Sequence, residues 1–139
     1  MTENAVITIK SVHDSAEDPF EFITDGYYSF ENNVGSIRYE ESLLTGMEGT
    51  QTFMQFLPDR ILLNREGTVT STMLFQKGIV NSMPYDTPFG STMMGLDTKQ
   101  IRQEFNPDGG KAEIEYVLGI KHKQLSRVKM SISVEKQGV

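Results

Sequence analysis

The sequence predicts an all-β protein, a closed and mostly antiparallel up-and-down barrel, because apolar residues alternate with polar ones in segments separated by short turns. The alternation is clearest near the C-terminus, where every second residue is apolar over 112–120 and again over 128–134. Successive side chains of a strand point to opposite faces, so this pattern indicates one buried and one exposed face. Between such segments stand turn-forming sequences such as Asn32-Asn33 and Asp108-Gly109-Gly110.

The predicted strands follow one another with short connections and no helix of convincing length. They span residues 5–12, 20–31, 34–44, 50–57, 60–66, 68–76, 78–85, 91–97, 100–105, 111–121 and 126–135. Most of them end near Asn, Asp, Gly or Pro, which favour turns or stop a strand. Strands joined by short turns are expected to pair in chain order, giving a meander. A meander this long avoids exposed edges by closing into a barrel, and a β-sandwich is the alternative.

Length and composition indicate a single domain covering residues 1–139, since 139 residues with 37% hydrophobic content can bury one core. The net charge of -6 argues against a nucleic-acid or anionic-membrane partner. With no cysteine, disulfides and thiolate metal sites are excluded. No basic leader precedes an apolar run, and no stretch approaches about 18 consecutive apolar residues. We therefore expect a cytoplasmic protein.

Several short motifs spread over almost the whole chain resemble the YwiB-like family of uncharacterised bacterial proteins. The motifs are Tyr39-Glu40-Glu41, Asn64-Arg65-Glu66-Gly67, Phe75 with Gly78, Tyr85-Asp86-Thr87-Pro88-Phe89-Gly90, and Thr98. Their order and spacing carry the resemblance, since each motif alone is short. The resemblance implies a calycin-like, that is lipocalin-like, β-barrel. It implies no reaction, substrate or catalytic residue, and a fold by itself does not confer ligand binding.

Two charged residues share the parity of apolar neighbours and are predicted to point into the barrel. Glu41 has the parity of Tyr39, and Arg65 has the parity of Ile61 and Leu63. A buried charge is costly unless it is paired, so a Glu41–Arg65 interaction is the expected resolution. The pair is either a structural ion pair, or two residues at barrel rims, or a site that orients a ligand or performs catalysis.

Methionine and aromatic residues are candidates for lining a cavity. Met54, Met73, Met83 and Met93 fall on four predicted strands, with Met94 and Met130 in addition. Flexible thioethers can line an adaptable apolar cavity, although they also fill gaps in solid cores. The segment 85–90 is either a cap over one barrel mouth or a rigid turn. The candidate ligand-binding residues are therefore Glu41, Arg65, Tyr39, Met73, Met83, Tyr85 and Phe89.

No catalytic or metal-binding motif is present, and we expect no cofactor. His13 and His122 lie far apart in the sequence and lack metal-ligand spacing. Three functions remain open. The first is a barrel that binds a small apolar or amphipathic ligand, and the second is a structural or protein-interaction module, whose barrel is filled by side chains and which binds a protein partner or a second copy. The third is an enzyme that uses Glu41 and Arg65. An internal cavity below about 100 Å³ would favour the second.

Overall fold

The computed structural model describes residues 2–14, 19–87, 90–120 and 123–137. Within these residues the chain forms ten strands and one 3-10 helix, joined by turns and short irregular segments. The elements are β1 Glu3–His13, β2 Phe20–Glu31, β3 Val34–Glu40, η1 Leu43–Thr45, β4 Thr50–Leu57, β5 Arg60–Gly67, β6 Ser71–Phe75, β7 Val80–Thr87, β8 Gly90–Asn106, β9 Gly109–Ile120 and β10 Lys123–Lys136.

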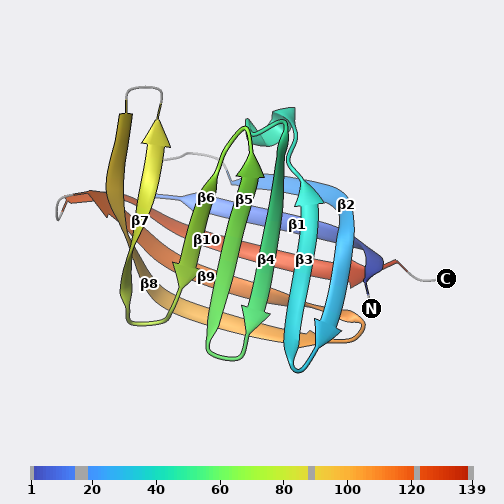
Figure 1. Ribbon diagram of the computed structural model, residues 1–139. Coiled ribbons are helices and arrows are strands. Elements are labelled where there is room, and N and C mark those ends of the chain that lie inside the picture. The colour runs from blue at the N-terminus through green and yellow to red at the C-terminus, as the bar shows by residue number, and fades with distance from the viewer. Residues whose placement is uncertain (1, 15–18, 88–89, 121–122, 138–139) are drawn as a thin grey trace.

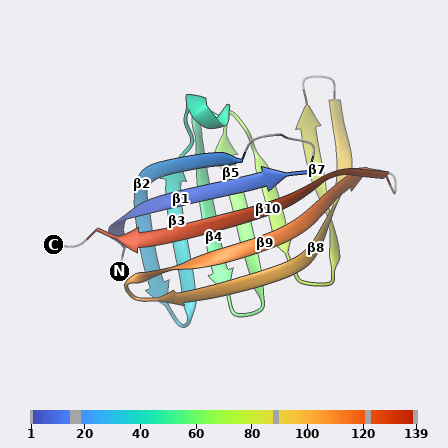
Figure 2. The ribbon, with the colours of Figure 1, turned by 180° about the vertical axis from the view of Figure 1, so that it is seen from behind.

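The ten strands form one antiparallel sheet in the order β6-β5-β4-β3-β2-β1-β10-β9-β8-β7. Strands adjacent in the chain pair with each other, except β6 with β7, and β1 pairs with β10, which joins the two ends of the chain. Figures 1 and 2 show the sheet curling round so that β3 to β6 cross the strands β1, β10, β9 and β8 at a steep angle. The predicted all-β antiparallel meander barrel is therefore confirmed, and it is nearly closed.

Within the described residues, backbone pairing between neighbouring strands continues round the barrel except between β6 and β7. We call this gap the seam. The side chain of Asn81 bridges this seam: its Nδ2 donates to the backbone oxygen of Leu74 at 2.9 Å and to Oε1 of Gln76 at 3.1 Å. A side-chain amide thus replaces backbone pairing at one point of the seam, where the described residues of β6 and β7 form no backbone ladder.

β2 belongs to both layers of the flattened barrel. Its first part pairs with β1, where Gly26 lies opposite Ala5, and its last part pairs with β3 from Tyr27 onward. In Figure 1 the strand bends as it passes from one layer to the other. A Cβ at position 26 would lie 2.5 Å from Cδ1 of Ile7 and 2.6 Å from the backbone oxygen of Arg38. Glycine at this position therefore allows the two layers to approach.

Aromatic side chains gather at one end of the barrel. The rings of Phe56 and Phe105 stack with their centroids 4.2 Å apart, and the Tyr28 hydroxyl donates to the backbone oxygen of Asn106 at 2.7 Å. The C-terminal alternation behaves as predicted, because Ile114, Tyr116, Val128, Met130, Ile132 and Val134 are buried, whereas Leu118 and Ile120 are partly buried.

Three details differ from the sequence prediction. The predicted strands 91–97 and 100–105 are parts of the single strand β8, whose register with β9 shifts between Thr98 and Gln100. The predicted strand 34–44 ends at Glu40 and leads into η1. Of the two adjacent candidates Met93 and Met94, Met93 is 57% exposed and Met94 is 7% exposed, so Met94 points inward and Met93 does not line the interior. Met94 shares the parity of the buried Leu96 and Thr98, so it lies on the inner face while Met93 lies on the outer face. No helix in the described ranges has the length and apolar content to cross a membrane.

Candidate functional site

A row of polar side chains crosses the inner face of four neighbouring strands. Tyr39 of β3 lies opposite Thr52 of β4, Thr52 lies opposite Arg65 of β5, and Arg65 lies opposite Ser71 of β6. Directly opposite residues of antiparallel strands have Cβ atoms about 4.5–5.5 Å apart, so these side chains are neighbours. We call these four residues and Glu41 the polar row.

Glu41 comes directly after β3, and its backbone N donates to the oxygen of Thr50 at 2.8 Å, which keeps the chain beside β4 for one more residue. Its side chain is only 2% exposed. Oε2 of Glu41 accepts a hydrogen bond from Oγ1 of Thr52 at 2.5 Å. A hydrogen bond to a charged acceptor is stronger than a neutral one, so Thr52 stabilises the buried carboxylate.

Arg65 points inward and lies near Glu41, with Nε of Arg65 3.9 Å from Oε2 of Glu41. This distance suits an ion pair and is too long for a hydrogen bond. Nη1 of Arg65 contacts Sδ of Met73 at 3.9 Å, and sulfur is a weak acceptor. Nε of Arg65 and Oγ of Ser71 are both buried without a hydrogen-bond partner in the described part of the chain.

Two tyrosines keep their hydroxyl groups neutral beside this pair. Burial raises the pKa of Tyr39 well above its usual value, and the Glu41 carboxylate raises it further. Burial raises the pKa of Tyr116 to about 12. The Tyr116 ring packs against Phe75 with centroids 5.0 Å apart, which holds it in the interior. Both tyrosines therefore act as neutral polar groups at neutral pH.

Two adjacent cavities open beside the polar row, at the barrel end opposite the aromatic core. The first, which we call the Glu41 chamber, has about 460 Å³ and is lined by residues that include Phe22, Tyr39, Glu41, Leu63 and Val128. The second, which we call the seam chamber, has about 380 Å³ and is lined by residues that include Ser71, Met73, Met83, Met94 and Leu118. Met47, Arg65, Tyr116 and Met130 line both. The barrel is therefore not filled solid by side chains.

Five of the seven candidate residues come together at these chambers. Glu41, Arg65 and Tyr39 line the Glu41 chamber, and Arg65, Met73 and Met83 line the seam chamber. Tyr85 lies in β7, but its side chain is outside the described part of the structure, and Phe89 lies outside the described residues altogether.

The sequence reasoning missed Thr52 and Ser71 as partners in the polar row. Thr52 has the parity of Met54 and Phe56 in β4, and all three are buried. A small polar residue among inward apolar ones was the available signal for Thr52. Ser71 could be found only from the β5–β6 register, which places it opposite Arg65.

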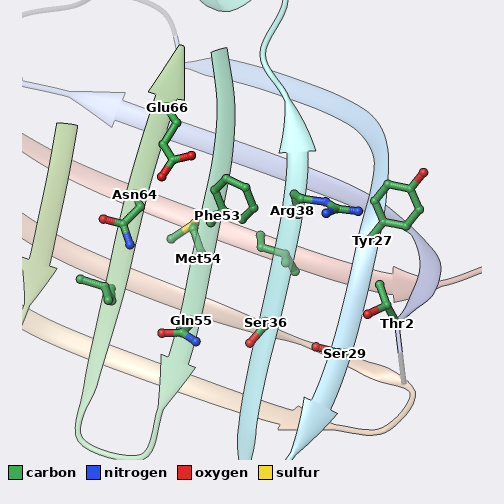
Figure 3. Close-up of a pocket in the computed structure, with 12 residues that line it drawn as sticks. Thr2, Tyr27, Ser29, Ser36, Arg38, Phe53, Met54, Gln55, Asn64 and Glu66 are labelled. Carbon is green, nitrogen blue, oxygen red and sulfur yellow. The ribbon is translucent and has the colours of Figure 1, made fainter. Parts of the chain in front are cut away.

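A separate groove of about 400 Å³ lies on the outer face of β2 to β5 (Figure 3). Tyr27, Arg38 and Phe53 lie across it, and the Arg38 guanidinium carbon is 4.7 Å from the centre of the Tyr27 ring. Of the buried polar side-chain atoms without a partner in the described ranges, none belongs to this groove. The unmet hydrogen-bonding capacity at the polar row makes the interior the better candidate site.

Metal chemistry has no support in the described residues, which contain no group of three or more His, Cys, Asp or Glu side chains placed to hold an ion. His13 lies at the edge of the Glu41 chamber, where its Nδ1 is 3.4 Å from Oγ of Ser126. His122 lies outside the described residues.

Comparison with known proteins agrees with this architecture. Residues 6–132 match the family described as "Domain of unknown function (DUF1934)". The chain is 26% identical over 129 residues to the "Uncharacterized beta-barrel protein YwiB" of Bacillus subtilis (strain 168), which covers 91% of this chain and 89% of YwiB. It also superposes on the crystal structure of the ywiB protein from Bacillus subtilis with a TM-score of 0.82 and 23% identity, covering 99% of this chain and 94% of that one.

Proposed function

Because the chain belongs to the DUF1934 family and resembles YwiB, a β-barrel protein without an assigned activity, we propose from its own cavities that it binds a small amphipathic molecule inside the barrel. The polar group of the ligand lies at Arg65, and its apolar body lies against the methionines of the seam chamber. The family match supports the resemblance predicted from the motifs. Neither the match nor the resemblance assigns a ligand.

The proposal rests on two observations: the chambers are large enough for a small molecule, and polar atoms of Arg65 and Ser71 in their walls lack hydrogen-bond partners in the described residues. Chambers of about 460 and 380 Å³ lie within the range of about 300–1,000 Å³ that holds small molecules. Their walls combine apolar side chains with several polar ones, as in ligand sites where polar groups fix the orientation of an apolar body. A filled barrel that served only as a structural module would have no need of this space.

Flexible side chains favour an apolar body of adaptable shape. Met83 and Met94 lie opposite each other on β7 and β8, and Met73 faces the same chamber from β6. Thioether chains have several rotatable bonds and adjust to irregular surfaces. The chamber therefore suits a family of apolar shapes better than one rigid shape.

A protein-interaction role is the second candidate, and exposed apolar residues favour it. Ile79 just before β7, Val80 at the start of β7 and Met93 of β8 are 46%, 63% and 57% exposed. Exposed apolar side chains contribute to contacts between proteins. The experiment below separates an interior site from this surface.

Binding is tested with prodan, a neutral fluorophore whose emission rises in apolar surroundings, together with native mass spectrometry of gently purified protein. Met94→Trp fills the seam chamber, and Met93→Trp is the matched control because Met93 faces outward. We expect the wild type and Met93→Trp to bind prodan, and Met94→Trp to lose at least about tenfold in affinity, or about 1.4 kcal/mol.

The folded state of each variant is checked by far-UV circular dichroism. If Met94→Trp does not fold, Met83→Phe replaces it at the same chamber. Loss of prodan binding in Met93→Trp with retention in Met94→Trp would place the site on the outer surface. Absence of prodan binding by the wild type, with no small molecule retained in native mass spectra, would overturn the proposal.

A further inference from the structure

Two adjacent residues in the wall of the seam chamber carry hydrogen-bond donors that have no partner in the described part of the chain. Arg65 and Ser71 are directly opposed on β5 and β6, and both line this chamber. Nε of Arg65 and Oγ of Ser71 are buried and have no hydrogen-bond partner within the described residues. An unsatisfied buried polar group carries a desolvation cost, so two of them side by side indicate a place for an acceptor.

The contacts within the polar row explain why the Nε–H group of Arg65 has no acceptor in the described residues. Thr52 already donates to the Glu41 carboxylate, which therefore does not depend on Arg65 for a hydrogen bond. Arg65 contributes charge to Glu41 from 3.9 Å and directs Nη1 at the Met73 sulfur. Its Nε–H group is the strong donor that remains unused.

The charge of the site decides what kind of acceptor fits. Glu41 and Arg65 balance each other, so the unliganded pair is neutral overall. A ligand carboxylate at Arg65 would add a second negative charge close to the buried Glu41 side chain, and removing that charge from water is costly. A neutral carbonyl oxygen has lone pairs for both donors and adds no charge.

Resting on the binding function proposed above, we propose that the ligand carries an uncharged oxygen acceptor, such as a ketone, ester or amide carbonyl, that accepts hydrogen bonds from Nε of Arg65 and Oγ of Ser71. Its apolar body extends along Met73, Met83 and Met94. The barrel thus selects neutral amphipathic molecules against the corresponding acids.

The test is competition against prodan at neutral pH by three molecules with the same chain: methyl octanoate, octanoate and octylammonium. We expect methyl octanoate to bind at least about tenfold more tightly than octanoate, a ratio that corresponds to about 1.4 kcal/mol. Octylammonium, which offers donors where the site needs an acceptor, should be weaker than the ester.

Two variants distinguish the effect of the Ser71 hydrogen bond on ligand affinity from the effect of the Glu41 charge. Ser71→Ala should weaken methyl octanoate about threefold to tenfold, the effect expected for one hydrogen bond, and should shift the emission of bound prodan to the blue as its carbonyl loses a donor. Ser133→Ala, at an exposed position of β10, is the control. Glu41→Gln should reverse the preference toward octanoate, because it leaves the Arg65 charge uncompensated.

Octanoate binding as tightly as methyl octanoate to the wild type, or an unchanged preference in Glu41→Gln, would overturn this inference while leaving ligand binding in place. Failure of the wild type to bind prodan, with no small molecule retained in native mass spectra, would instead overturn the binding function. If Ser71→Ala does not fold, Ser71→Gly removes the same hydroxyl, and the Glu41→Gln reversal stands as an independent test.

Discussion

Arg65 lies 3.9 Å from Glu41, within ion-pair range but beyond a hydrogen bond, although Arg65 is 21% and Glu41 2% exposed in their side chains. Buried pairs of this kind are stable only when further hydrogen bonds satisfy the charged groups. Glu41 has such a bond from Thr52, whereas Nε of Arg65 has none in the described residues. The two partners are therefore unequal, and removal of each should have a different cost.

Glu41→Gln should destabilise the protein more than Arg65→Met. The first leaves a guanidinium without its counter-ion, and about 3 kcal/mol is expected for breaking a buried pair from one side. The second leaves a carboxylate that still accepts from Thr52. The double variant should be milder than the sum of the single ones. Urea unfolding of all four proteins measures the coupling, and additivity within about 0.5 kcal/mol would show that the two charges do not interact.

Ile132→Ala should cost about 2–5 kcal/mol, because Ile132 is 1% exposed and its truncation leaves a cavity in the core. Ile23→Ala is the matched control: Ile23 is 60% exposed on β2, and its truncation should change stability by less than about 0.5 kcal/mol. Equilibrium urea denaturation gives both values. Equal losses at the two positions would mean that the inward face is misassigned.

Asn81→Ala should loosen the seam without unfolding the barrel. The substitution removes both side-chain hydrogen bonds that join β7 to Leu74 and Gln76, each worth about 1 kcal/mol. Hydrogen exchange followed by mass spectrometry should show faster exchange in β6 and β7 and little change in β1 and β10, which pair along most of their length. Uniformly faster exchange over all strands would contradict a local role for Asn81.

Stability should fall steeply at alkaline pH. Burial raises the pKa of Tyr116 to about 12, against an ordinary value near 10. The folded state thus holds this proton more tightly than the unfolded state, so the associated stability is complete below about pH 10 and is lost as pH rises through about 12. Tyr116→Phe should make the urea midpoint less sensitive to pH in that window. An unchanged slope in Tyr116→Phe would contradict this assignment.

The site is only partly readable from the sequence, for reasons that particular residues illustrate. Parity alone placed Glu41 and Arg65 inside, because a strand that buries one face commits every second residue to it. The sequence names both Met93 and Met94 as candidates for lining a cavity, and the structure decides between them, because Met94 is 7% exposed and Met93 is 57% exposed. Ser71 carries no local signal at all, and only its position opposite Arg65 reveals it.

By itself the sequence determined the all-β meander, the segments that form its strands, and the inward direction of Glu41 and Arg65, since alternation and turn residues act over a few neighbouring positions. Tertiary structure alone decided that β6 and β7 do not pair and that chambers open beside the polar row. It also decided that Thr52 rather than Arg65 donates a hydrogen bond to the Glu41 carboxylate. These features depend on distances between strands and on how side chains from many strands share one volume, and neither quantity is encoded in local pattern.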